Sequence, residues 1–220
     1  MIKIRLIIAL LTISVFASAQ KNKEAESILE KAADKAISYK TIHSKFEFLV
    51  ENSQNETEDT YNGELWVKGK KFKMSVDQTI TFSDGKTRWV YLTEVNEVNI
   101  STIEKDEDMD PEELFLIEPL SLFTLYKKGF KYSISGTQLI EGQNYTVIDL
   151  SPEELNKPYF KIKCWISDDS DYYAVKYFQK DGTRITLNLI DFISNEKIKD
   201  TTFSFDTKAY PNVEVIDLRD

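Results

Sequence analysis

The stretch "TIHSKFEFLV", Thr41 to Val50, alternates apolar and polar side chains from one residue to the next. Phe46 and Phe48 lie on one side of this alternation, and Lys45 and Glu47 lie on the other. Successive side chains of a β-strand point to opposite faces of a sheet, so the period of two predicts a strand with one buried, partly aromatic face. A sheet with such a face needs another layer to cover it.

The segment directly before this strand has a different period. In "KEAESILEKAADKAISYK", residues 23–40, the apolar side chains recur at helical spacing, with Ile28 and Leu29 among them, and charged residues fill the opposite side. This pattern predicts one amphipathic helix that opens the folded domain.

The period of two continues after the first strand. Turn signals such as Asp84-Gly85 separate the successive runs, so we expect consecutive antiparallel strands joined by tight hairpins, with Asp84 as a turn residue and not a catalytic acid. The apolar pairs of these runs are Leu65 and Val67, Phe72 and Met74, Ile80 and Phe82, and Trp89 and Tyr91.

Residues 104–129 break the strand pattern. Pro111 and Pro119 suit first helical positions, and Leu114, Ile117 and Leu120 form an apolar stripe, so two short helices are expected here. About ten or eleven strands with only two helical regions predict a mainly β fold: a strongly curved antiparallel sheet that forms an incomplete, half-open barrel, covered by the helices. The pattern alone favours an ordinary core over a ligand cavity on the covered face but leaves both open.

The amino terminus is typical of a secretory signal peptide. Lys3 and Arg5 form a basic start, residues 6–16 are almost wholly apolar, and Ala17-Ser18-Ala19 resembles a cleavage site. We expect removal of residues 1–19, leaving 20–220 as one soluble exported domain. The apolar run is shorter than a membrane span of about 20 residues. Gln20 stands where a lipid-anchored protein would have Cys.

Charge and reactive residues exclude several functions. A net charge of −9 disfavours binding to nucleic acids. The single cysteine, Cys164, lies within a strand pattern and is expected to be a buried thiol, and the single histidine, His43, faces away from Phe46. The acidic run Asp106 to Asp110 has Pro111 where an EF-hand loop requires Gly. We therefore expect no enzyme activity, metal or cofactor.

Four segments, in order, resemble the LolA family of periplasmic lipoprotein carriers. They are "TIHSKFEF", "GELWVKGKKF", "SDGKTRWVY" and "FSFDTKAYPNVEVID", and the opening helix also matches. The resemblance implies an incomplete antiparallel barrel whose helices form a lid over a hydrophobic cavity. The resemblance therefore favours a ligand cavity over an ordinary core on the covered face of the sheet.

The resemblance also implies a function. Such carriers take acylated lipoproteins from an inner-membrane ABC complex, sequester the acyl chains and pass them to an outer-membrane acceptor, and we expect this chain to do so as a monomer in the periplasm. An envelope-stress sensor or regulatory lipid-binding module on the same half-barrel is the alternative. The implied cavity residues are Phe46, Phe48, Leu65, Val67, Phe72, Met74, Ile80, Phe82, Trp89 and Tyr91, and the implied lid residues are Ile28, Leu29, Leu114, Ile117 and Leu120.

One position departs from the family pattern. Family members commonly carry an Arg after the "LWVK" segment that holds the lid closed by hydrogen bonds, and this chain has Gly69 followed by Lys70. Arg88 is expected to face solvent because its neighbour Trp89 is expected to face inward.

Overall fold

The computed structural model describes residues 23–104, 109–127 and 129–219. The predicted signal peptide, residues 1–19, and the acidic positions Asp106 and Asp108 lie outside the described residues. No helix within the described ranges is long and apolar enough to cross a bilayer.

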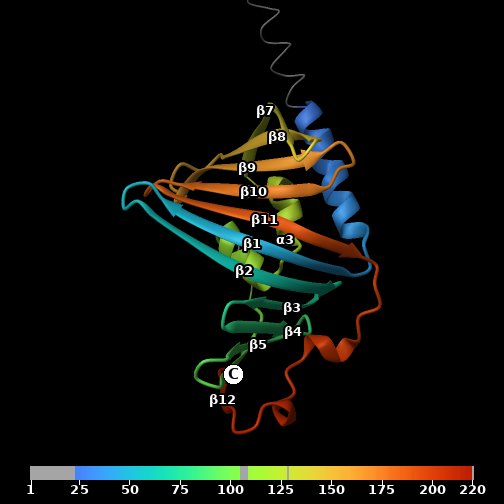
Figure 1. Cartoon of the computed structure of the whole chain (residues 1–220), viewed down its shortest axis with the longest axis vertical. Coiled ribbons are helices and arrows are strands. Elements are labelled where there is room, and N and C mark those ends of the chain that lie inside the picture. The colour runs from blue at the N-terminus through green and yellow to red at the C-terminus, as the bar shows by residue number, and fades with distance from the viewer. Residues whose placement is uncertain (1–22, 105–108, 128, 220) are drawn as a thin grey trace, which may run out of the picture.

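Within these ranges, twelve strands form one curved sheet that does not close into a barrel (Figure 1). Their order across the sheet is β12-β6-β5-β4-β3-β2-β1-β11-β10-β9-β8-β7. The strands are β1 (Ile42–Asn52), β2 (Thr57–Lys68), β3 (Lys71–Val76), β4 (Thr79–Ser83), β5 (Thr87–Leu92), β6 (Glu97–Thr102), β7 (Phe130–Ile140), β8 (Gln143–Pro152), β9 (Tyr159–Ser167), β10 (Tyr172–Gln179), β11 (Thr183–Ser194) and β12 (Glu214–Asp217).

The prediction of a mainly β, half-open antiparallel barrel is confirmed. Neighbouring strands pair antiparallel except for β12, which adds parallel to β6 at one edge. The described sheet has twelve strands where the sequence predicted about ten or eleven. The segment "TTFSFD", residues 201–206, overlaps the short helix η2 (Asp200–Phe203).

The helices cover the concave face of the sheet. The first helix, residues 23–38, runs along one side of the sheet, and α2 (Pro111–Ile117) and α3 (Ser121–Thr124) lie behind its central strands (Figure 1). The short helix η1 (Leu125–Lys127) follows α3. The first helix buries Ala25, Ala32 and Ala33 together with Leu29, and its small side chains let the backbone approach the sheet closely. Pro111 begins α2 as predicted, whereas Pro119 lies in the turn before α3.

Because of a two-residue turn between β3 and β4, the large apolar side chains of these two strands lie on opposite faces of the sheet. Residues Asp77 and Gln78 form the turn, so Val76 pairs with Thr79 and their side chains share one face. Thr81 and Ser83 therefore lie on the lid side, next to Met74 and Phe72. The aromatic side chains of β4 and β5 consequently lie on the convex face.

The convex aromatic residues form a second core with the carboxyl-terminal segment. Phe82, Tyr91 and Val98 are buried against Phe205, and Tyr210 stacks on the Phe205 ring at a centroid distance of 4.4 Å. The Phe205 centroid lies 5.7 Å from that of Phe82 and 5.4 Å from that of Tyr91. The two parts of the sheet are thus covered on different faces. The lid covers the concave face of β1 to β3 and β8 to β11, and residues 203–213 cover the convex face of β4 to β6.

Polar contacts attach the start of this carboxyl-terminal segment to the convex face. The Asp200 carboxylate accepts hydrogen bonds from Lys68 Nζ at 2.6 Å and Lys71 Nζ at 2.9 Å. The two nitrogens of His43 lie 2.7 Å from Glu64 Oε1 and 3.0 Å from Glu196 Oε1, so His43 joins the segment to β2. His43 is on the convex face, as expected from the alternation in β1.

Gly63 on β2 makes room for the central aromatic side chain of the main core. A Cβ atom at this position would lie 2.2 Å from Phe46 Cζ, well inside van der Waals contact. Phe46 pairs with Gly63 in the strand register and is almost fully buried. The glycine is therefore required by packing.

We expect Gly63→Ala to lower the free energy of unfolding by about 1–3 kcal/mol, because the added methyl group displaces the Phe46 ring. Urea unfolding measures this change. Combining Gly63→Ala with Phe46→Leu should cost less than the sum of the two single changes. Asn62→Ala, on the exposed neighbouring residue, should have little effect, and additivity of the two core changes would contradict the packing account.

Asp200 should make the attachment of the carboxyl-terminal segment pH-dependent. Hydrogen bonds from Lys68 and then Lys71 lower the pKa of Asp200 to about 2. Because this folded-state pKa lies below the ordinary carboxyl value of 3.8, the stabilisation is complete above that value and is lost as the pH falls toward about 2. Hydrogen-exchange protection of residues 200–213 should fall over this range.

The matched variants are Asp200→Asn and Asp191→Asn, since Asp191 pairs with Lys45 at 3.2 Å on an exposed part of β11. Asp200→Asn should lower protection of the segment at neutral pH and remove the acid step, and Asp191→Asn should do neither. Equal protection in both variants would show that the lysine contacts do not hold the segment.

Candidate ligand-binding cavity

The concave face under the lid gathers six of the predicted cavity residues. Strand β1 supplies Phe46 and Phe48, and β2 and β3 continue the same face because their residues pair in register. All belong to or pack against one hydrophobic cluster. These six residues are Phe46, Phe48, Leu65, Val67, Phe72 and Met74.

Phe115 of α2 inserts from the lid into this face. Its ring meets Phe46 edge-on at a centroid distance of 6.2 Å and Phe48 at 5.9 Å, with interplanar angles of 87° and 88°. Phe46 and Phe48 also contact each other at 5.1 Å. The three rings form an aromatic cluster that joins α2 to β1, hereafter the Phe46–Phe48–Phe115 cluster.

The predicted lid residues are all buried or partly buried. Leu29 and Ile117 are buried, whereas Ile28, Leu114 and Leu120 are partly buried, and Ile28 and Leu120 pack against the main core. The sequence pattern does not single out Phe115, because the apolar stripe through Leu114 and Ile117 predicts a different buried side of the helix. An aromatic residue adjacent to that stripe was the available signal.

The space between lid and sheet is small in this closed arrangement. A void of about 20 Å³ remains beside Phe46, Phe115 and Leu120. A cavity of about 340 Å³ opens next to it, lined by Phe48, Met74 and the exposed Leu116 among others. A further cavity of about 340 Å³ lies near Gly69 and Ile117, where α2 ends, and shares Val67 and Leu120 with the small void. Side chains of the lid thus fill the middle of an apolar passage with an opening at each end.

Four predicted cavity residues are not part of this passage. Phe82 and Tyr91 belong to the second core on the convex face, and Ile80 and Trp89 pack against that core. The prediction that these four residues line the cavity is therefore wrong. The prediction assumed that the same odd–even alternation continues from β3 into β4. The two-residue turn at Asp77 and Gln78 reverses this alternation.

Arg88 lies on the concave face, contrary to the expectation that it faces solvent. It pairs with Ser83, which itself pairs with the cavity residue Phe72, so the three side chains share one face. Arg88 Nε is buried and has no hydrogen-bond partner among the described residues. Gly69, where the family Arg was expected, is a turn residue with a φ of 59°.

Cys164, the single cysteine of the sequence, is buried. Burial raises the pKa of the Cys164 thiol to about 12, so this thiol stays protonated and unreactive at neutral pH. Its burial in the main core confirms the expectation of a structural cysteine. Among the residues that the structure describes, no group of three or more His, Cys, Asp or Glu side chains is placed to hold a metal ion.

Two substitutions test which face of the sheet, concave or convex, binds an apolar ligand. We expect Phe48→Ala to weaken binding of an apolar fluorescent probe about tenfold, because burying such a side chain is worth about 1.5–3 kcal/mol and 1.4 kcal/mol is a factor of ten. Phe82→Ala should leave the probe affinity unchanged in the folded protein while lowering its stability. Probe titration and thermal unfolding measure the two effects. The reverse pattern would place the ligand on the convex face.

Comparisons with known proteins agree with this architecture. The chain is 10% identical to an uncharacterised conserved protein of Thermus thermophilus, with a TM-score of 0.54 over 88% of this chain and 99% of that one. It is 14% identical to a LolA superfamily protein of Nitrosomonas europaea, with a TM-score of 0.44 over 83% of this chain and 98% of that one.

A sequence relative and a family model extend this comparison. An uncharacterised protein of Methanocaldococcus jannaschii is 24% identical over 192 residues, which are 86% of this chain and 53% of the relative. The chain thus spans about half the length of the curated relative that it matches. Residues 13–173 match the model of the outer membrane lipoprotein carrier protein LolA. The chain therefore belongs to the LolA family of outer membrane lipoprotein carrier proteins.

Proposed function

We propose that this protein is an exported carrier of lipoproteins that holds their acyl chains between the concave face of the sheet and the helical lid. It takes them from an inner-membrane ABC complex and delivers them to an outer-membrane acceptor, as a monomer in the periplasm and without catalysis. The observation that carries the proposal is the Phe46–Phe48–Phe115 cluster, which fills the centre of an apolar passage with a side chain of the lid.

The lid is suited to open because its helices are short. Helix α2 has seven residues and α3 has four, and isolated helices of this length are not stable in water. Their position therefore depends on side-chain packing against the sheet. Each aromatic contact of Phe115 contributes about 0.5–1.5 kcal/mol beyond its buried area. An acyl chain that replaces Phe115 restores apolar contact with Phe46 and Phe48, so the ligand offsets the loss.

The energetics of acyl chains explain why such binding is reversible. Burying about ten methylene groups from water contributes about 8 kcal/mol, which corresponds to roughly micromolar affinity. Acyl chains come from a bilayer, however, which is as apolar as the cavity. The hydrophobic contribution then largely cancels, and small differences in lid packing and polar contacts decide the direction of transfer.

Phe115 should compete with the ligand for the same space. We expect Phe115→Ala to increase the affinity for a fluorescent fatty acid by about threefold or more, because the ligand no longer displaces a packed aromatic ring. The same change should lower the unfolding free energy by about 3–5 kcal/mol. Leu155→Ala, at an exposed position that lines none of the cavities described above, is the control. Reduced affinity in the folded Phe115→Ala protein would mean that the ring binds the ligand and does not compete with it.

Release of lipoproteins from membranes tests the proposed function. Inner-membrane vesicles that contain the ABC complex and a labelled lipoprotein should release the label into solution when the purified protein and ATP are added. Met74→Asp should abolish release because it places a carboxylate in the apolar passage. Ser75→Asp, which points to the opposite face of β3, should release normally.

The outcome of this assay also distinguishes the regulatory alternative. Acyl-chain binding without release, together with binding to another envelope protein, would favour the sensor. Normal release by a folded Met74→Asp protein would contradict the assigned cavity.

A further inference from the structure

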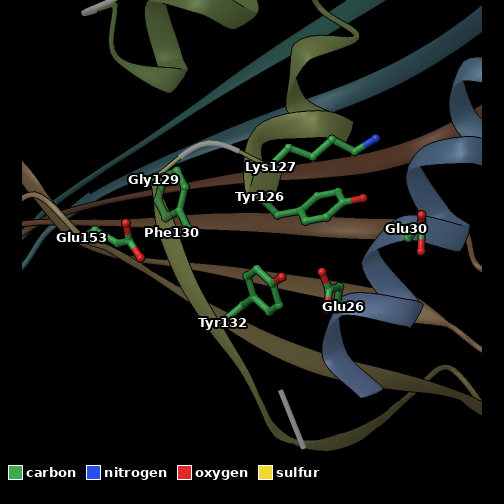
Figure 2. A pocket seen from close by; sticks show the side chains of 8 residues that line it. All are labelled: Glu26, Glu30, Tyr126, Lys127, Gly129, Phe130, Tyr132 and Glu153. Atoms are coloured by element: carbon green, nitrogen blue, oxygen red, sulfur yellow. The ribbon is translucent and has the colours of Figure 1, made fainter. Parts of the chain in front are cut away.

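A separate cavity lies away from the Phe46–Phe48–Phe115 cluster. It measures about 440 Å³ and opens between the first helix, η1 and the edge strand β7. Figure 2 shows its side chains converging from these three elements. The lining residues are Glu26, Glu30, Tyr126, Lys127, Gly129, Phe130, Tyr132 and Glu153.

Carboxylates dominate the charge of this cavity. Glu26 and Glu30 project from the first helix one turn apart, and Glu153 faces them from the end of β8 (Figure 2). Like charges four residues apart destabilise a helix by a few tenths of a kcal/mol, and Asp34 continues the series by one more turn. The lining contains one cation, Lys127, against these three carboxylates.

Aromatic rings form the floor of the cavity. The Tyr126 and Tyr132 centroids are 6.1 Å apart with an interplanar angle of 79°. Burial and then the nearby Glu26 carboxylate raise the pKa of Tyr132. Burial, followed by the charges of Glu30 and Asp34, raises the pKa of Tyr126 to about 12. The negative field of the helix carboxylates therefore reaches the buried end of the cavity.

The same rings connect the cavity to the interior. Tyr126 is a member of the main hydrophobic cluster, and Phe130 and Tyr132 pack against it. A molecule whose apolar chain displaces side chains of this cluster could keep its polar end in this cavity. The carboxylates would repel a phosphate or carboxylate group and attract a cation.

Lys127 shows that an ammonium group fits against this aromatic surface. Its Nζ lies 5.8 Å from the centroid of the Tyr126 ring, within the range of a cation–π contact. Among the described residues no ion pair of Lys127 with a lining carboxylate is found within 4.0 Å. A ligand cation would meet the same ring face with Glu26 and Glu30 beside it.

We propose that this cavity, hereafter the acid–aromatic cavity, binds the primary ammonium headgroup of an amphiphile whose apolar chain lies under the lid. The inference rests on the proposed acyl-chain binding and adds a headgroup preference to it. Carboxylates of the first helix supply the charge, and the faces of Tyr126 and Tyr132 supply cation–π contacts.

A series of twelve-carbon amphiphiles tests the preference. Displacement of an apolar fluorescent probe is measured with dodecylamine in its ammonium form, dodecanol and dodecanoate, each below its micelle concentration. We expect dodecylammonium to bind about tenfold more tightly than dodecanol, which is the combined size of one cation–π contact and one partly exposed ion pair. Dodecanoate should bind more weakly than dodecanol, and raising the salt concentration should reduce both differences.

The variant Glu26→Gln/Glu30→Gln should remove most of the preference for dodecylammonium while leaving the dodecanol affinity unchanged. Glu24→Gln, on another side of the same exposed helical turn, is the matched control and should retain the preference. A short lysine peptide without an alkyl chain should compete poorly.

Three results would overturn the assignment: equal binding of the ammonium and the alcohol, a preference that survives in the double variant, or a lysine peptide as effective as dodecylammonium. These results differ from failure of the proposed function, in which none of the three amphiphiles would displace the probe.

Discussion

The two-residue turn at Asp77 and Gln78 is the constraint on which the rest of the structure depends. A loop of two residues pairs the residue before it with the residue after it, here Val76 with Thr79, and so reverses the odd–even alternation along the chain. Asp77 adopts a φ of 47°, which the turn requires. Strands β1, β2 and β3, before this turn, direct their apolar side chains to the lid, and strands β4, β5 and β6, directly after it, direct theirs to the carboxyl-terminal segment.

Because of this reversal, the two groups of strands bury opposite faces of the sheet. Strands β4, β5 and β6 bury their convex face permanently under Phe205 and Tyr210, which leaves their concave face more polar. Strands β1, β2 and β3 bury their concave face only under short helices. The proposed carrier function uses this division, because its acyl-chain site lies under the short helices α2 and α3 while a separate core stabilises the other part of the sheet.

Much of the fold could be predicted from the sequence because local patterns agree with it. The helix over residues 23–38, the strand through Phe46 and the short helix that begins at Pro111 all follow from periodicity and capping. The side of Phe82 and Trp89 could not be predicted from alternation alone, since it depends on the number of residues in one turn. The inward position of Arg88 follows from the same turn. The insertion of Phe115 depends on how α2 rotates against the sheet, which no local pattern specifies.

The central claim is that acyl chains occupy the space under α2. Native mass spectrometry of the protein purified from the cell envelope tests this claim most directly, with Met74→Asp and Ser75→Asp as matched variants. The account predicts that the wild-type and Ser75→Asp proteins carry acylated molecules and that the folded Met74→Asp protein carries none. Equal amounts of bound lipid in all three proteins would contradict it.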